Sequence, residues 1–193
     1  PVNFFNCNFL SNREGDDYVN IFRSSFALNN CNFRNSNADA LDLDFSDGLI
    51  QQCNFYNIGN DAIDASGSSI TINNGVIDGV LDKAISSGEN SKIKVDNLNI
   101  LNSEIAFAAK DKSTLGINNS TVTNSTIGFT AFQKKPEFGP AEIYVNNTTL
   151  SDIEMKYLIE KKSILSIDSV FMTNKQKNIK ELMYGIKFGK SSK

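Results

Sequence analysis

A short motif recurs about every 22 residues along the chain and limits the folds that it can adopt. Asn-Cys-Asn-Phe at residues 30–33 aligns with Gln-Cys-Asn-Phe at 52–55 and with Asn-Cys-Asn-Phe at 6–9. The apolar residue that ends the motif continues, in degenerate form, as Phe9, Phe33, Phe55, Ile77, Ile100, Val122, Leu150 and Phe171. The steps between these positions are 24, 22, 22, 23, 22, 28 and 21 residues. A near-constant period of this size is typical of a solenoid, in which each repeat packs against its neighbours.

Within each repeat, apolar and polar residues alternate in three short segments that polar turns separate. Such alternation is typical of strands with one buried face. It predicts that Ile63 and Ala65 point inward and that Asp64 and Ser66 point outward. The sequence therefore predicts an all-β fold, a right-handed parallel β-helix that forms a single solenoid of about eight coils of ~22 residues, with three strands per coil.

An asparagine-rich turn separates the second and third strands of most repeats. It recurs at residues 29–30, 51–52, 73–74, 97, 118–119, 146–147 and 168, with Gln or Asp in place of Asn at two of these turns. Asn tolerates the left-handed backbone that a tight bend requires. Amides stacked in register can also hydrogen-bond from coil to coil, so we expect an asparagine ladder.

The repeat divides the chain into a β-helix over residues 1–173 and a C-terminal cap with a basic tail over 174–193. The tail carries six lysines and one acid, Glu181, and residues 179–183 are expected to form a short turn that caps the open end. Because the chain opens inside a repeat, we expect a fragment of a longer protein with other domains. It contains no run of about 18 apolar residues, so no membrane span is expected.

The composition excludes several kinds of chemistry. The chain contains no histidine, which removes Ser-His-Asp and Cys-His catalysis and any imidazole base. With 19 basic and 22 acidic residues the net charge is -3, and no clustered basic footprint points to nucleic acid. Cys7, Cys31 and Cys53 share one repeat slot and are interpreted as stacked core residues. Chemistry must use carboxylates, lysines, arginines, hydroxyls or a hard metal ion.

The outward positions of the first strands carry the candidate functional residues. Stacked strands place them in columns with a spacing of about 4.8 Å. One column reads Asp42, Asp64, Ser86, Ala108 and Thr130, and the next reads Asp44, Ser66, Gly88, Lys110 and Phe132. Asp39, Asp61, Asp82, Lys83, Glu89 and Asp111 lie near them in sequence.

Asp42 beside Asp64 places like charges on adjacent strands, which destabilises the pair unless something offsets it. One carboxyl can be protonated, with a raised pKa, or a cation can neutralise the cluster. An all-oxygen donor set suits Ca²⁺. Alternatively, these aspartates are solvated or paired with lysines such as Lys83.

The 28-residue step locates an insertion at residues 133–140, directly after the first strand of its coil. We expect it to project beside the same face as a wall or lid. Phe132 and Phe138 either offer a surface on which a sugar ring can stack or pin the loop to the solenoid.

These residues resemble known proteins. The architecture resembles the β-helix superfold of pectate lyases. The blocks at 39–48, 61–68, 82–91, 109–113 and 131–139 resemble the β-helix regions attached to bacterial spore-coat-H-like, kinase-fold proteins. The lyase resemblance implies Ca²⁺ held by Asp42, Asp64 and Asp44, and Lys110 as the base that takes the sugar C5 proton. It further implies that Lys134 or Lys135 engages substrate carboxylates. An extracellular or cell-surface location in a bacterium is implied as well.

Three classes of function are open. The expected one is a noncatalytic surface module that binds an acidic polysaccharide or another glycan, or has a structural role. The second is a uronate lyase or epimerase with Lys110 as base and Asp64 beside it. The third is an inverting glycoside hydrolase with pairs drawn from Asp42, Asp44, Asp61 and Asp64, which must stand about 6.5 to 9.5 Å apart. Candidate substrate-binding residues are Asp44, Ser66, Ser86, Phe132, Lys134 and Lys135.

Overall fold

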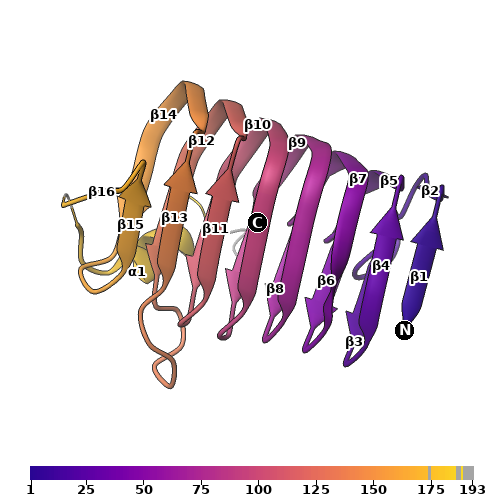
Figure 1. The fold of residues 1–193 in the computed structure, drawn as a ribbon, viewed down its shortest axis with the longest axis horizontal. Helices are drawn as coiled ribbons and strands as arrows, with labels where there is room; N and C mark the ends of the chain where they lie inside the picture. Colours follow the sequence, from indigo (N-terminus) through magenta and orange to yellow (C-terminus); the bar gives the residue numbers. More distant parts are fainter. Residues whose placement is uncertain (174, 186–187, 189–193) are drawn as a thin grey trace.

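Parallel strands of successive repeats stack into one right-handed β-helix (Figure 1). The computed structural model describes residues 1–173, 175–185 and 188. The strands are β1 (Val2–Phe5), β2 (Asn8–Phe9), β3 (Val19–Phe22), β4 (Ser25–Asn29), β5 (Asn32–Ser36), β6 (Leu41–Asp44), β7 (Asp47–Ile58), β8 (Ile63–Ser66), β9 (Ser69–Gly88), β10 (Lys92–Lys110), β11 (Thr114–Asn118), β12 (Thr121–Phe132), β13 (Glu142–Asn146), β14 (Thr149–Ile159), β15 (Ile164–Ile167) and β16 (Val170–Phe171). One helix, α1 (Ile179–Met183), follows them.

The predicted repeat anchors form one continuous row inside the solenoid. Phe9 pairs in register with Phe33, Phe33 with Phe55, and Phe55 with Ile77. The row continues through Ile100 and Val122 to Leu150. The rings of Phe33 and Phe55 stack with their centroids 4.8 Å apart and their planes 6° apart. The 22-residue register is therefore confirmed.

The turns adopt the backbone that the sequence predicts. Residues 30, 52, 74, 97, 119, 147 and 168 all have positive φ. Side-chain amides link neighbouring coils, as where the Asn30 amide donates to Asn6 Oδ1 at 2.7 Å and that of Asn147 donates to Asn119 Oδ1 at 2.7 Å. These hydrogen bonds form the expected asparagine ladder.

The last repeat differs from the prediction. Asp168 and Ser169 both have positive φ, which suits a tight two-residue hairpin turn, so β16 folds back antiparallel on β15. Phe171 is consequently 62% exposed and does not continue the core row. Assigning Phe171 to the buried slot was wrong, because the chain reverses direction before reaching it.

The C-terminal segment lies on the side of the solenoid. Ile179 and Met183 of α1 pack, together with Phe188, against outward side chains of three coils. These side chains are Ile105 and Ala108 of β10, Ile127 and Phe132 of β12, and Leu158 of β14. The expected capping turn at 179–183 is thus a helix that covers part of the first-strand face. Of the predicted basic tail, Lys187, Lys190 and Lys193 lie outside the described residues.

The described residues contain no helix with the length and apolarity that a membrane span requires. The division at residue 173 into β-helix and cap stays a prediction.

Replacing Phe55 by Ala should lower the free energy of unfolding by about 3 to 5 kcal/mol, because the ring is 1% exposed and a cavity would remain in the stack. Chemical denaturation measures the change. Phe171→Ala is the matched control, for which we expect less than about 0.5 kcal/mol because its ring is exposed. Equal effects at the two positions would contradict the register.

Candidate functional site

The predicted columns exist on the first-strand face. Asp42 pairs in register with Asp64, and Asp64 with Ser86. Ser86 pairs with Ala108, and Ala108 with Thr130. In the second column Asp44 pairs with Ser66, Ser66 with Gly88, and Lys110 with Phe132. Alternation along each strand therefore places these side chains on one outer surface.

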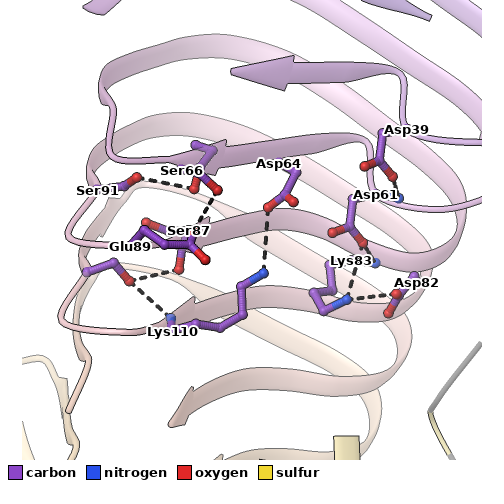
Figure 2. Close-up of polar contacts among 12 residues, drawn as sticks. Asp39, Asp61, Asp64, Ser66, Asp82, Lys83, Ser87, Glu89, Ser91 and Lys110 are labelled. Atoms are coloured by element: carbon purple, nitrogen blue, oxygen red, sulfur yellow. Dashed lines mark hydrogen bonds and ion pairs between the residues drawn. The ribbon is translucent and has the colours of Figure 1, made fainter. Parts of the chain in front are cut away.

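Asp39 and Asp61 form a third column. Each lies just before the first strand of its coil, which is β6 for Asp39 and β8 for Asp61. Each aspartate accepts a backbone N–H from the next coil: Asp39 Oδ1 from Asp61 at 2.7 Å, and Asp61 Oδ1 from Lys83 at 3.0 Å. The Asn60 amide also donates to Asp39 Oδ1 at 2.6 Å. These hydrogen bonds fix both carboxylates toward the groove described below (Figure 2).

Two buried lysines reach into this acidic surface. The Lys83 ammonium lies 2.7 Å from Asp82 Oδ2 and 3.4 Å from Asp61 Oδ1. The Lys110 ammonium lies 3.6 Å from Asp64 Oδ1 (Figure 2). Lys83 is 6% exposed and Lys110 is 5% exposed, so both charges are largely removed from water. A buried ammonium needs such carboxylate partners to stay charged.

A groove of about 400 Å³ runs over these residues. Its acidic and basic lining comprises Asp39, Asp61, Asp64, Asp82, Lys83, Lys110 and Lys134, together with Asn60. Met183, Tyr184 and Phe188 of the C-terminal segment supply its apolar wall. The Lys134 ammonium lies 4.7 Å from the centre of the Tyr184 ring, a cation–π contact that joins the insertion to the wall.

The insertion at 133–140 is tied to the solenoid beside the groove, as expected. Asp111 Oδ1 accepts the backbone N–H groups of Lys134 and Lys135, each at 2.7 Å. The Lys135 ammonium lies 2.6 Å from Glu89 Oε1. Asp111 is therefore a loop anchor, and its carboxylate is aimed at the loop backbone.

The surroundings of the aspartates shift their pKa values in different directions. Burial, together with the charge of Asp61, raises the pKa of Asp39 to about 7. Burial and the charges of Asp44 and Asp64 raise the pKa of Asp42 to about 7. For Asp64, burial opposes ionisation, but the Lys110 ammonium and the neighbouring Ser86 hydroxyl outweigh it and lower the pKa. One face thus holds carboxyl groups that titrate near neutral pH beside one that is ionised there.

Several predicted substrate-binding residues are differently placed. Ser86 and Phe132 are both fully buried, and Phe132 lies under the C-terminal segment with its ring centroid 6.3 Å from that of Tyr184. Neither presents a surface to a ligand. Sequence reasoning did not anticipate the burial of Phe132, because the segment that covers it is remote in sequence. The Ser66 hydroxyl donates to Glu89 Oε2 at 2.5 Å. Asp44 is half-buried and lies outside the groove lining.

The predicted role of Lys110 as general base does not fit the site. Although burial acts to lower it, the carboxylate of Asp64 and other nearby groups raise the pKa of Lys110 well above its ordinary value. A lysine held as an ammonium has no lone pair with which to accept a proton. Lys110 is suited to stabilise negative charge or to donate a hydrogen bond.

Of the predicted calcium ligands Asp42, Asp44 and Asp64, Asp64 alone belongs to the cluster of three carboxylates found among the described residues. One oxygen each of Asp39, Asp61 and Asp64 lie within 4.8 Å of one another, whereas Asp42 accepts a hydrogen bond from Asn20. Ca²⁺ takes six to eight oxygens and would have to sit beside the ammonium groups of Lys83 and Lys110. Both cations would repel a further cation, which disfavours Ca²⁺ at this site. Titration tests whether the predicted calcium site exists.

Sequence reasoning missed Asn60 and the wall residues Met183, Tyr184 and Phe188. The repeated Asp-Ala at 39–40 and 61–62 was a usable signal for the third column, because both aspartates occupy the same slot. No local pattern indicates that α1 returns to the side of the solenoid.

Asp39→Asn should make stability less dependent on pH. A carboxyl whose pKa is raised from 3.8 to about 7 binds its proton more tightly in the folded chain. Its contribution to stability is therefore complete below about pH 4 and is lost as pH rises through about 7. As pH rises through this range, the melting temperature should fall less in the variant than in the wild type. Some fall should remain in the variant, because Asp42 also titrates there. The exposed Asp152→Asn is the control, and identical slopes for both variants and the wild type would disprove the assignment.

A calorimetric titration with CaCl₂ addresses the metal. We expect no binding heat with the wild type, because the ammonium groups of Lys83 and Lys110 already form ion pairs with Asp61 and Asp64 and would repel Ca²⁺. Heat that appears with the wild type and vanishes in Asp64→Ala would instead place a metal on this face.

The comparisons with known proteins agree with the fold. No curated protein and no solved structure matches the chain. The model of a family described as right-handed beta helix region matches residues 17–171, which is most of the chain. The likeness to the spore-coat-H-linked proteins stays a prediction. The chain therefore belongs to the right-handed β-helix family.

Proposed function

We propose that the chain is a noncatalytic β-helix module that binds carbohydrate in the groove between the first-strand face and the C-terminal segment. The observation that carries the proposal is the lining of this groove. Carboxylates and ammonium groups form its floor, and Tyr184 and Phe188 form its wall. A sugar residue combines hydroxyl groups, which donate and accept hydrogen bonds, with an apolar ring face.

Two polar side chains face the groove from its two sides. The Asp64 side chain is 25% exposed and lines the groove, while its buried Oδ1 lies 3.6 Å from the Lys110 ammonium. No carboxylate of the described chain lies within ion-pair distance of the Lys134 ammonium, which points into the groove lining. An acceptor and a donor at the two sides of the groove match a hydroxyl-rich ligand. Lys134 also accommodates a uronate carboxylate.

The charge state of the lysines favours binding over proton abstraction. Lys83 and Lys110 are both held as ammonium groups by adjacent carboxylates, which leaves the uronate-lyase alternative without a base from either residue. Extracellular or cell-surface location, and attachment to further domains, belong to the same proposal. They rest on the fold and on the family resemblance.

Glycoside hydrolysis is the second candidate function. Asp39 titrates near neutral pH whereas the pKa of Asp64 is lowered, which resembles the division of roles between the two carboxyl groups of glycosidases. Their oxygens, however, lie within 4.8 Å, closer than the about 6.5 to 9.5 Å of inverting enzymes and nearer the about 5 to 5.5 Å of retaining ones. A hydrolase at this site would therefore be a retaining enzyme.

Calorimetric titration with cellohexaose, mannohexaose, xylohexaose, hexagalacturonate and hexamannuronate tests the proposal. We expect at least one to bind, and Tyr184→Ala to weaken it roughly five- to tenfold by removing the aromatic wall. Tyr144→Ala is the matched control, because this 36%-exposed tyrosine lies on β13 outside the groove. Incubated sugars should release neither unsaturated products nor new reducing ends.

Each other result has a definite meaning. Unsaturated products would establish a lyase, and new reducing ends that disappear in Asp39→Asn would establish a hydrolase. If no hexasaccharide binds, or if Tyr184→Ala and Tyr144→Ala bind equally well, the groove is not a carbohydrate site.

A further inference from the structure

Two phenylalanines are exposed on the first-strand face, on the N-terminal side of the groove. Phe22 is 54% exposed and Phe45 is 56% exposed. Phe22 ends β3 and pairs in register with Asp44, which pairs with Ser66. Phe22 therefore continues the second outward column, and Phe45 follows directly at the turn. Large apolar side chains exposed together on a functional face call for a reason.

The backbone conformation at position 45 disfavours a phenylalanine there. Phe45 has φ 50°, in the left-handed region that a bulky residue rarely enters. Positive φ is a property of this turn, since the equivalent residues Arg23 (φ 49°), Gly67 (φ 63°) and Glu89 (φ 47°) share it, and the unusual feature is a bulky aromatic side chain in the slot. Because the ring of Phe45 is mostly in solvent, burial does not offset the strain.

The surroundings hold the two rings in place and leave each phenylalanine more than half exposed. A Cβ at Gly67 would come within 2.7 Å of the Phe45 ring, so glycine there makes room for the ring. The rings of Phe22 and Phe45 meet edge to face, with centroids 6.1 Å apart at 85°. The Arg23 guanidinium lies 5.0 Å and 5.7 Å from the two ring centres. Rings that are fixed and exposed before binding lose little entropy when a ligand stacks on them.

We propose that Phe22 and Phe45 form an aromatic platform in which a sugar ring stacks on one of the two perpendicular rings, and that this platform extends the carbohydrate site beyond the groove. The proposal rests on the proposed carbohydrate binding. It adds a subsite about two strand spacings from Asp64, or about 10 Å along the solenoid axis. Asp42 and Asp44 lie between the platform and the groove, where their carboxyl groups can bind sugar hydroxyls.

The position of the platform predicts a dependence on ligand length. A disaccharide bound in the groove is too short to reach the platform, whereas a hexasaccharide that follows the axis contacts both. Lengthening the ligand should therefore increase affinity in the wild type, and the platform should be responsible for the increase.

Phe45→Asn tests the platform, because asparagine suits positive φ and removes the ring. The probes are the tightest-binding hexasaccharide of the panel above and the disaccharide of the same sugar. We expect the hexasaccharide to bind roughly tenfold more weakly, the disaccharide to bind as before, and the melting temperature to stay equal or rise. Leu81→Asn is the matched control, because Leu81 is 66% exposed and lies outside this face.

Three outcomes overturn the platform. A melting temperature several degrees lower in Phe45→Asn, with unchanged affinity, would mean that the ring is structural. Unchanged affinity and stability would mean that it has no part in binding, while the groove remains a carbohydrate site. If the wild type binds no sugar of either length, both proposals fail together. Fluorine NMR of fluorophenylalanine-labelled protein adds a direct readout, in which the Phe22 and Phe45 signals shift with the hexasaccharide and not with the disaccharide.

Discussion

Coil-to-coil hydrogen bonding in a near-constant register is the constraint on which the rest of this structure depends. Because each residue pairs with the one about 22 positions later, every position of the repeat becomes a column along the solenoid. Apolar columns such as Phe9, Phe33 and Phe55 stack into the core. Columns that point outward bring like side chains together whether or not they attract. The functional face follows from this, since a repeated Asp-Ala motif must place carboxylates side by side.

The molecule resolves the resulting repulsion by inserting cations from later coils. Lys83 occupies the column that Asp39 and Asp61 begin, and Lys110 reaches back across the coil of Ser86 to Asp64. Burial acts in the opposite direction: it raises the pKa of Asp61 in spite of Lys83, and it raises the pKa values of Asp39 and Asp42 to about 7. The same face thus combines ionised, protonated and cationic groups within a few strand spacings. Such a surface can exchange hydrogen bonds with a polar ligand in both directions.

The sequence predicted whatever depends on the repeat and little of what depends on distant contacts. Fold class, register, the left-handed turns and the outward columns at Asp64 and Ser66 follow from periodicity, and all are found. Phe171 was misassigned because a two-residue turn, at Asp168 and Ser169, reverses the chain. Phe132 was expected on the surface because α1 has no local signal that it returns to cover it. The protonation of Lys110 likewise depends on a carboxylate 46 positions away in the chain.

The position of α1 also bears on how the solenoid unfolds. Coils of a solenoid normally contact only their immediate neighbours, so one end can open while the other stays folded. Here the short helix α1 packs against three coils simultaneously, through Ala108 of β10, Phe132 of β12 and Leu158 of β14. Opening any of these three coils removes contacts from the other two, which makes the C-terminal half a cooperative unit. The early coils lack such a cross-brace among the described residues, so the molecule should open from its N-terminal side first.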